Sequence, residues 1–269
     1  MRKILTFILT VAVIAFAFSS CSIENYDYDN PEKYTRGGGS IADNVKEIDI
    51  NWVSGNVEVK FHGESSVVFY EDSESMLDEK TSMYHYFDGR TLHIEFFSAG
   101  VHVGRVPDKT LTVFIPQSLT LDEIDIECVS ADVNVEEISA SSVNIETVSG
   151  EISLTSSVGM SDVSLESVSG DIKCNLTTET AEMDVETVSG DLNLYFDAFP
   201  RKLNIDSVSG DTTLYIPESS GLLLEFESVS GDFDSEVSAS VKNGNYLIGD
   251  GASRAEFEST SGDLSIKKK

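Results

Sequence analysis

Apolar and polar residues alternate along most of the chain after its first 40 residues. In runs such as Val143-Asn144-Ile145-Glu146, the apolar side chains fall on one side and the acids or amides on the other, as in a half-buried β-strand. Each run leads into the phrase Val-Ser-Gly-Asp or a near copy, and a second alternating run follows. No helical period follows the first 21 residues. The pattern therefore predicts an all-β protein.

The phrase recurs every 19 to 21 residues between Ala131 and Gly231. A fixed period of this size indicates stacked supersecondary units. Complete and near copies stand at Val53–Asn56, Val129–Asp132, Val148–Glu151, Val168–Asp171, Val188–Asp191, Val208–Asp211, Val229–Asp232 and Thr260–Asp263.

Strands this short cannot bury a core within one repeat, but parallel units that stack like over like can. We therefore expect a right-handed parallel β-solenoid with coils of about 20 residues. The alternative is an antiparallel meander in which Ser-Gly forms a hairpin loop. The solenoid predicts two apolar columns, one of Ile126, Ile145, Leu165, Val185 and Ile205 and one of Val133, Ile152, Ile172 and Leu192.

The hydrophobic ends of a solenoid need caps, and two regions that break the repeat are candidates. Residues 60–120 contain expected strands at 66–71 and 109–116 and a hairpin around Asp88-Gly89. The last repeat is stretched and holds Lys242-Asn243-Gly244-Asn245, a second hairpin signal. We expect an N-terminal hairpin cap and a C-terminal hairpin insertion at 235–257.

Residues 1–21 have the form of an export signal. Arg2 and Lys3 precede an apolar run from Ile4 to Phe18, which is short for a membrane span. The small residues before Cys21 resemble the lipobox of bacterial lipoproteins, which implies that Cys21 is acylated. Cleavage by ordinary signal peptidase after Ala15-Phe16-Ala17, giving a secreted protein, and an uncleaved anchor are the alternatives.

The remaining chain divides into a tether and a domain. Residues 22–40 are polar, acidic and Gly-rich, which favours a flexible tether. Residues 41–269 form the expected domain, with the first coil and N-terminal cap in 41–120 and the repeat coils in 121–269.

Charge and cysteine content narrow the functional classes. A formal charge of −29 and a pI near 4.2 argue against nucleic acid as a partner. Three cysteines are too few for a disulfide framework. Cys128 and Cys174 are expected to be small buried fillers that do not pair.

The corners of the predicted coils carry the most regular polar residues. Glycine suits a corner that needs a positive φ or a close backbone approach, which assigns a structural turn role to Gly150, Gly170, Gly190, Gly210, Gly231 and Gly262. The acid that follows each corner belongs to what we call the corner ladder: Asp132, Glu151, Asp171, Asp191, Asp211, Asp232 and Asp263.

Neighbouring carboxylates of this ladder would repel, by roughly 0.8 kcal/mol at ~5 Å in water and about 3 kcal/mol at an effective dielectric of 20. Hydrogen bonds within the turns are the preferred way to relieve this repulsion. A recognition face and calcium binding are alternatives. The candidate calcium ligands are Asp171, Asp191, Asp211 and Asp232, although the Gly-Gly-x-Gly-x-Asp repeat of calcium β-rolls is absent.

No catalytic site and no cofactor is predicted. A repeated ladder does not single out an acid and a base with different environments. The histidines are His62, His85, His93 and His102, without metal-binding spacing. His85 and His93 could face each other across the Asp88-Gly89 hairpin, but roles on the strand surface are preferred.

Three features together resemble the YvlB-like "putative adhesin" domain of unknown function in bacteria. They are Lys109-Thr-Leu-Thr-Val-Phe-Ile-Pro116, the serial Val-Ser-Gly-Asp coils, and the closing segment from Ile248-Gly-Asp-Gly251 to Ile266. The resemblance covers residues 41–269. It implies a secreted or membrane-tethered β-solenoid, and it supplies no catalytic residues.

We therefore expect a non-catalytic, lipid-anchored module outside the cytoplasm, with a structural or binding role in the bacterial cell envelope. Its expected partners are the membrane, through lipid on Cys21, and an envelope or extracellular protein or glycan. The alternatives are an enzyme acting on polysaccharide through a β-helix, and a calcium-stabilised surface protein.

Overall fold

The computed structural model describes residues 26–42, 44–102 and 104–269. The export signal and Cys21 lie outside the described residues. Within the described part, no helix has the length and apolar character needed to cross a membrane.

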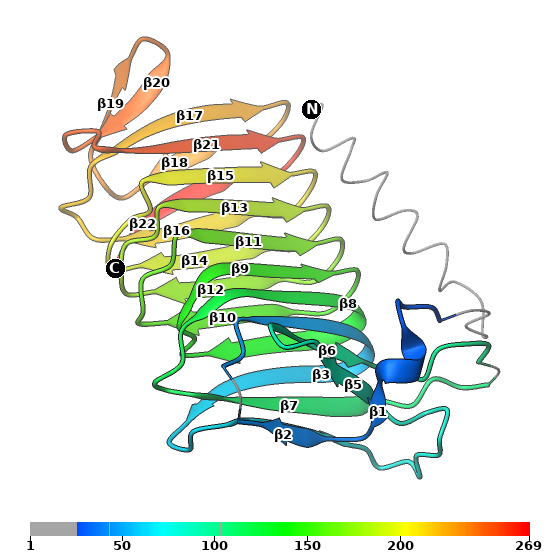
Figure 1. The fold of residues 1–269 in the computed structure, drawn as a ribbon. Helices are drawn as coiled ribbons and strands as arrows, with labels where there is room; N and C mark the ends of the chain where they lie inside the picture. The colour runs from blue at the N-terminus through cyan, green and yellow to red at the C-terminus, as the bar shows by residue number, and fades with distance from the viewer. Residues whose placement is uncertain (1–25, 43, 103) are drawn as a thin grey trace.

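The chain winds into stacked coils, each with two strands that meet at a Val-Ser-Gly-Asp corner (Figure 1). The strands before the corners form a first layer, and those after the corners form a second layer. Neighbouring coils pair in parallel in both layers, which confirms the predicted parallel solenoid and not the antiparallel meander. Buried apolar side chains from both layers form one core between them.

The first layer contains, from one end of the stack to the other, β6 (Thr91–Glu95), the first part of β3 (Glu47–His62), the first part of β8 (Leu121–Glu136), β9 (Ala140–Thr147), β11 (Asp162–Ser167), β13 (Glu182–Thr187), β15 (Lys202–Ser207), β21 (Ser253–Ser259) and β17 (Leu222–Ser228). In the same order, the second layer contains β7 (Lys109–Pro116), the rest of β3 and of β8, β10 (Ile152–Ser156), β12 (Ile172–Leu176), β14 (Leu192–Phe196), β16 (Thr212–Ile216), β22 (Leu264–Lys268) and β18 (Phe233–Ser235).

The predicted apolar columns exist in register. Ile126, Ile145, Leu165, Val185 and Ile205 follow one another through the first layer. Val133, Ile152, Ile172 and Leu192 do the same in the second layer. All of these side chains are buried, so hydrophobic burial and strand pairing set the same register.

At the C-terminal end, the order of coils in space differs from their order in sequence. After β16 the chain moves outward to β17 and β18, and then forms the hairpin of β19 (Ala239–Lys242) and β20 (Asn245–Ile248). It returns to place β21 between β15 and β17. The predicted hairpin insertion is therefore the reversal that lets the last coil of the chain become the penultimate coil of the stack.

The N-terminal end has a similar inversion. β3 lies between β6 and β8 in the first layer, so the coil of residues 91–116 is outside the coil that precedes it in sequence. β4 (Val67–Asp72) pairs antiparallel with β7, and β5 (Tyr84–Phe87) pairs antiparallel with β6 across the predicted hairpin. These strands close this end of the stack.

Part of the segment expected to be a tether packs against this cap. β1 (Thr35–Arg36) pairs with β5, and β2 (Gly39–Ile41) pairs with β4. A single 3-10 turn, η1 (Pro31–Lys33), precedes them. Tyr26 is buried against Phe97 and donates its hydroxyl proton to Glu95. The packing of Tyr26 and the pairing of β1 and β2 order this segment in spite of its polar composition. The folded part therefore begins before Ile41.

The corners explain why glycine recurs. At Gly170, a Cβ atom would lie 1.8 Å from the carbonyl oxygen of Gly150, because the backbones of successive coils nearly touch there. A positive φ is required at Gly55 and Gly210, whereas close approach is the constraint at Gly170. The hydroxyl of the residue three places earlier, such as Ser167, accepts the glycine N–H.

We predict that Gly170→Ala lowers the free energy of unfolding by roughly 3 kcal/mol, because the added methyl group must push two coils apart. Gly63→Ala is the matched control, since a Cβ atom there meets nothing within 4 Å. Urea denaturation of both variants measures the difference. Equal stability of the two variants would contradict the close-approach explanation.

Candidate functional site

The corner ladder is a chain of hydrogen bonds that follows the order of coils in space. The Oδ1 atom of Asp171 accepts the backbone N–H of Asp191 at 2.9 Å, and Asp191 accepts that of Asp211 at 2.9 Å. Asp211 accepts from Asp263 at 3.1 Å, and Asp263 accepts from Asp232 at 2.8 Å. These carboxylates therefore connect each coil to the next.

This arrangement bears on the candidate calcium ligands. Asp171 and Asp191 each use one carboxylate oxygen for a backbone N–H, so part of their lone-pair capacity is already committed. Among residues 26–42, 44–102 and 104–269, no group of three or more His, Cys, Asp or Glu side chains is arranged to hold a metal ion. The hydrogen bonds of the corner acids run to turn N–H groups of the neighbouring coil and not within one turn.

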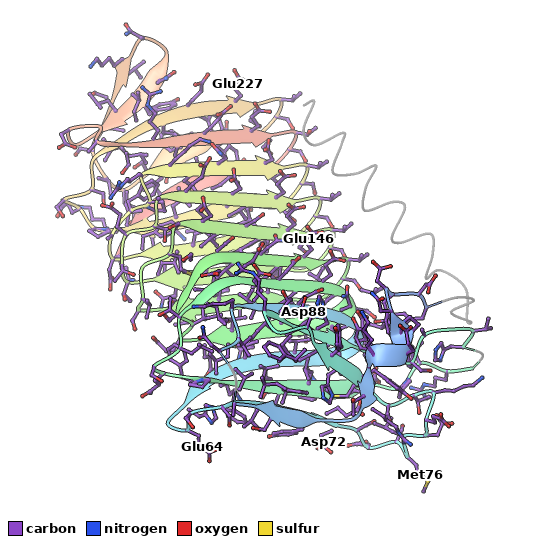
Figure 2. All side chains as sticks on the ribbon, viewed as in Figure 1. Glu64, Asp72, Met76, Asp88, Glu146 and Glu227 are labelled. Carbon is purple, nitrogen blue, oxygen red and sulfur yellow. The ribbon has the colours of Figure 1, made fainter. Side chains whose placement is uncertain are left out.

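A second set of acids forms a more unusual surface on the outward side of the first layer. Most of these residues stand two positions before the first residue of a phrase, and they stack in register from coil to coil. We call them the acidic column: Glu95, Glu127, Glu146, Glu166, Glu186, Asp206, Glu258 and Glu227, with Asn51 between the first two. Glu146 and Glu227 of this set are labelled in Figure 2.

Charge repulsion and burial act together along this column. Burial first, and then the charges of Glu146 and Glu186 on the adjacent coils, raise the pKa of Glu166 to about 7. The pKa of Glu127 is also raised, first by burial and then by Asp125 and Glu146. Neighbouring strands lie about 4.8 Å apart, so the column concentrates negative charge along one line.

The neighbouring outward column in the same layer is built differently. Several of its acids have a neutral or cationic neighbour: Asn144 donates to Asp125 at 2.9 Å, and His93 contacts Asp49 at 2.8 Å. Asn204 likewise donates to Asp184. Asp49 and Asp125 also lie beside each other. The hydrogen bond that the His93 ring makes to the Asp49 carboxylate raises the pKa of His93. The neutral and cationic neighbours offset part of the repulsion in this column, whereas every coil from Glu127 to Glu227 contributes an acid to the acidic column.

The N-terminal segment covers one end of the acidic column. Glu95 is 4% exposed and accepts the Tyr26 hydroxyl proton at 2.7 Å. Burial raises the pKa of Glu95 to about 7. Beyond Asn51, Glu127 and Glu227 are exposed, the acids of most coils between them are half-buried, and Asp206 is buried.

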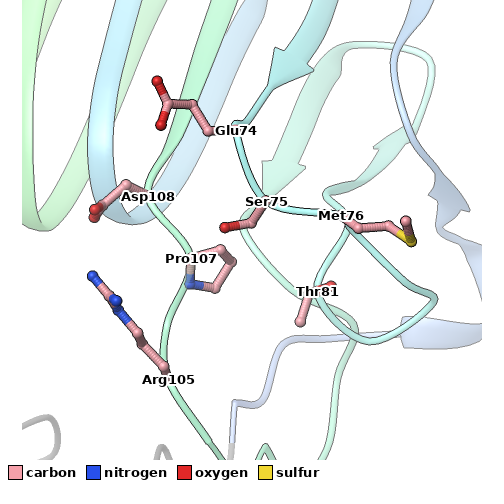
Figure 3. Close-up of a pocket in the computed structure, with 7 residues that line it drawn as sticks. All are labelled: Glu74, Ser75, Met76, Thr81, Arg105, Pro107 and Asp108. Atoms are coloured by element: carbon pink, nitrogen blue, oxygen red, sulfur yellow. The ribbon is translucent and has the colours of Figure 1, made fainter.

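A pocket of about 560 Å³ lies at the same end of the molecule, away from the column (Figure 3). Loops 73–83 and 98–108 form it, and its polar lining includes Glu74, Thr81, Arg105 and Asp108. Asp108 accepts the hydroxyl proton of Ser54 at 2.6 Å. This pocket therefore brings two exposed carboxylates, Glu74 and Asp108, to one site.

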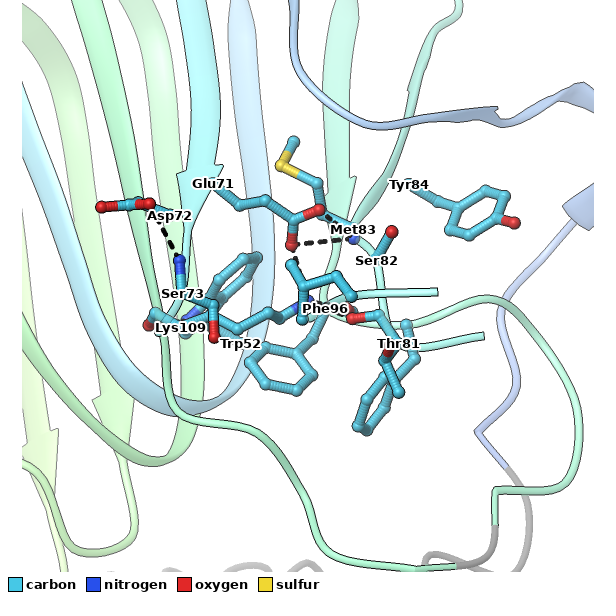
Figure 4. Close-up of polar contacts among 12 residues, drawn as sticks. Trp52, Glu71, Asp72, Ser73, Thr81, Ser82, Met83, Tyr84, Phe96 and Lys109 are labelled. Carbon is cyan, nitrogen blue, oxygen red and sulfur yellow. Dashed lines mark hydrogen bonds and ion pairs between the residues drawn. The ribbon is translucent and has the colours of Figure 1, made fainter. Parts of the chain in front are cut away.

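Lys109 lies buried behind this pocket (Figure 4). It occupies the corner position opposite Gly55, and its ammonium group lies 3.8 Å from the centre of the Phe96 ring. Nζ pairs with Glu71 at 2.9 Å and donates to the Thr81 carbonyl at 2.9 Å. Burial lowers the pKa of Lys109 to about 8. Because its side chain is 0% exposed, we interpret Lys109 as a structural residue that fills the corner of the outermost N-terminal coil.

The histidines and cysteines do not come together. His85 lies opposite Ile94 in the hairpin, while His93 lies opposite Tyr86, so these two histidines do not face each other. His62 and His102 bond to the carbonyls of Ser66 and Ser98. Cys128 and Cys174 are buried and unbridged, and burial raises the pKa of both thiols.

The acidic column was not predicted from the sequence, although the repeats carry a signal for it. Glu127, Glu146, Glu166 and Glu186 share one offset from their corners, as an alignment of the repeats shows. The neighbours of each acid in the two outward columns could not be predicted from the repeat, because they depend on which coils lie beside each other.

Comparison with known proteins gives one family match. The model of the Toastrack DUF4097 family matches residues 31–267. A search of curated proteins finds no significant match.

Several solved structures are similar at low identity. A putative cell adhesion protein from Clostridium sporogenes shares 14% identity with a TM-score of 0.42, covering 87% of this chain and 100% of that chain. A putative adhesin from Bacteroides fragilis shares 11% identity with a TM-score of 0.42, covering 88% and 98%. One from Parabacteroides distasonis shares 13% identity with a TM-score of 0.37, covering 88% and 94%. Likenesses at this level do not extend to a ligand.

We predict that Asp191→Ala destabilises the fold by about 1 kcal/mol, because the N–H of Asp211 loses its acceptor. Asp191→Asn keeps an oxygen at that position, and its stability should stay within about 0.5 kcal/mol of the wild type. Thermal denaturation with and without millimolar calcium measures both effects. A calcium-dependent rise in Tm that Asp191→Asn removes would instead favour a calcium site.

We also predict that Glu166→Gln stabilises the fold at pH 8 by about 1 kcal/mol, after allowance for solvent screening. Because the folded-state pKa of Glu166 is raised from 4.5 to about 7, the folded state holds the extra proton between these values. Wild-type stability should therefore fall as pH rises through this window. Urea denaturation across the window should show a flatter profile for Glu166→Gln. Glu64→Gln, on an exposed loop, is the control, and an unchanged pH profile in Glu166→Gln would refute the prediction.

Proposed function

The chain belongs to the Toastrack DUF4097 family, and we propose that it acts as a non-catalytic binding module of the bacterial cell envelope, anchored by lipid outside the cytoplasm. Its contact surface is the acidic column with the flat outward face around it. The proposal assigns the chain an adhesin-like role, in which a rigid scaffold presents a long charged surface to a protein or glycan.

The acidic column carries this proposal. The fold requires apolar residues at the inward positions, but it places no such demand on the outward ones. Like charges opposite each other on neighbouring strands destabilise a sheet. Nevertheless, acids occupy the same outward position in successive coils from Glu127 to Glu227. A costly pattern that folding does not need supports a role in recognition.

The proposed anchoring rests on the export signal and on Cys21, which lies outside the described residues. The folded part begins close after it, since Tyr26 already packs against Phe97. The proposed lipid would therefore hold the N-terminal cap near the membrane, with only a few residues between them.

The pocket lined by Glu74 and Asp108 favours a second candidate function, which is the polysaccharide-active enzyme. Two carboxylates that line one pocket can serve as acid and base in glycoside cleavage. Release of reducing ends from envelope polysaccharide by the wild type, and its loss in Glu74→Gln and Asp108→Asn, would support this alternative over the binding module.

We predict that replacing Glu127, Glu146, Glu166 and Glu186 together by Gln reduces binding to envelope extract or to glycan-array ligands by about tenfold or more. The loss follows from removing the charges of the acidic column while its shape is retained. The control removes the same charge from the exposed acids Glu32, Glu64, Glu151 and Asp234. Equal losses in both variants would show that net charge alone attracts the ligand.

We predict that Cys21→Ala moves the protein from the membrane fraction to the soluble fraction, because the proposed acylation site is removed. Cell fractionation measures the distribution, and Cys128→Ala is the control because its thiol is buried. If Cys21→Ala stays in the membrane fraction, the lipoprotein interpretation is wrong.

A further inference from the structure

The two ends of the solenoid are closed to different extents. At the N-terminal end, β5 covers β6, β4 covers β7, and β1 and β2 extend this cover. At the C-terminal end, β20 pairs with the outer edge of β17 only along Leu222–Leu224. Among the strands that the structure describes, none pairs with the outer edge of β17 beyond Leu224. We call Glu225–Ser228 the open edge.

The open edge has the backbone and side chains of an unfinished coil. Its inner edge pairs in parallel with β21, so the strand is held extended and its outward N–H and C=O groups are available for pairing. The Phe226 ring stacks on Phe257 at 5.4 Å with nearly parallel planes. Phe257 is 1% exposed, whereas Phe226 remains half-buried, because no further coil covers its other face.

The negative charges beside the open edge determine which kind of strand can pair with it. Glu225 and Glu227 flank Phe226 and are both exposed, and Glu227 lies on the outermost coil in Figure 2. A strand added at the open edge would place its alternate side chains directly across from these two acids. The favourable residues at those positions are Lys or Arg, with an apolar residue between them across from Phe226.

A second copy of the chain fits this edge poorly. Pairing of two open edges would bring Glu225 and Glu227 against the same acids of the other molecule, and each chain carries a formal charge of −29. The opposite end of a second copy is already closed by its antiparallel strands. Charge complementarity therefore selects a different, cationic polypeptide.

We propose that the open edge binds an extended segment of another protein by β-strand addition, and that this segment alternates cationic and apolar residues. Main-chain hydrogen bonds to β17 supply part of the affinity, and the pairing of cations with Glu225 and Glu227 supplies the specificity. Glu227 belongs to both surfaces, but the inference does not rest on the proposed function. It requires backbone pairing, which the strands of the acidic column from β8 to β21 cannot offer because both of their edges are paired.

The test uses the full chain and a fluorescent peptide of sequence Lys-Val-Lys-Val-Lys, with fluorescence anisotropy as the readout. A peptide methylated at every backbone nitrogen keeps the charges but cannot donate hydrogen bonds to a strand. We expect it to bind at least about tenfold more weakly than the unmethylated peptide. Equal binding of the two peptides would overturn the proposal, since attraction to the acidic surface alone would explain it. The absence of binding by either peptide at millimolar concentration would also overturn it.

Charge-reversal variants test whether the peptide binds at the open edge. The double variant Glu225→Lys with Glu227→Lys should lose about tenfold in affinity for the lysine peptide and gain a similar factor for Glu-Val-Glu-Val-Glu. The matched control is Glu123→Lys with Asp162→Lys, two exposed acids outside the acidic column on strands that are paired at both edges, and it should change affinity less than about threefold. An equal effect of the two double variants would overturn the proposal. So would a wild-type dimer in sedimentation velocity that the Glu225→Lys, Glu227→Lys variant abolishes, since the occupant would then be a second copy.

Discussion

The close contact between the corner of one coil and the backbone of the next is the constraint on which this structure depends. At Gly170, the Cα hydrogen takes the place of a side chain that would collide with Gly150. Ser169 donates to the carbonyl of Val148 across the same junction, and the corner ladder adds a carboxylate to backbone N–H bond at most steps. Because these contacts repeat at successive corners, they fix the register in which the strands of neighbouring coils pair. Every column of side chains follows from this register.

This register has opposite consequences inside and outside the stack. Inside, it places Ile145, Leu165 and Val185 on one another and buries them. Outside, the same register places Glu146, Glu166 and Glu186 beside one another. Burial and mutual repulsion disfavour the charged form of these acids, and both raise the pKa of Glu166. The corner acids escape this conflict by accepting N–H groups. In the acidic column, burial and the neighbouring acids instead raise the pKa of Glu166, and we assign this column to recognition.

Local repetition made most of the fold predictable, because each coil obeys the same alternation and the same corner chemistry. The columns through Leu165 and Ile172 and the hairpins at Asp88-Gly89 and Asn243-Gly244 followed from these rules. The insertion of β21 between β15 and β17 did not follow, because all coils carry nearly the same phrase, and nothing in a repeat states which neighbour it takes. The packing of Tyr26 was hidden by the polar residues around it. The open edge at Glu225 depends on the coil order and could not be inferred without it.

Coil order is therefore the claim to test most directly, and paired cysteines across the second layer can test it. In the structure, Thr213 lies beside Ser265 in parallel register, at a strand spacing of about 4.8 Å that permits a disulfide. Asp234 lies one coil further out, beside Ser265. In a background with Cys21→Ser, Thr213→Cys with Ser265→Cys should cross-link on mild oxidation, whereas Thr213→Cys with Asp234→Cys should not. Cross-linking of the second pair and not of the first would mean that the coils stack in sequence order, which would contradict the inserted coil and the position of the open edge.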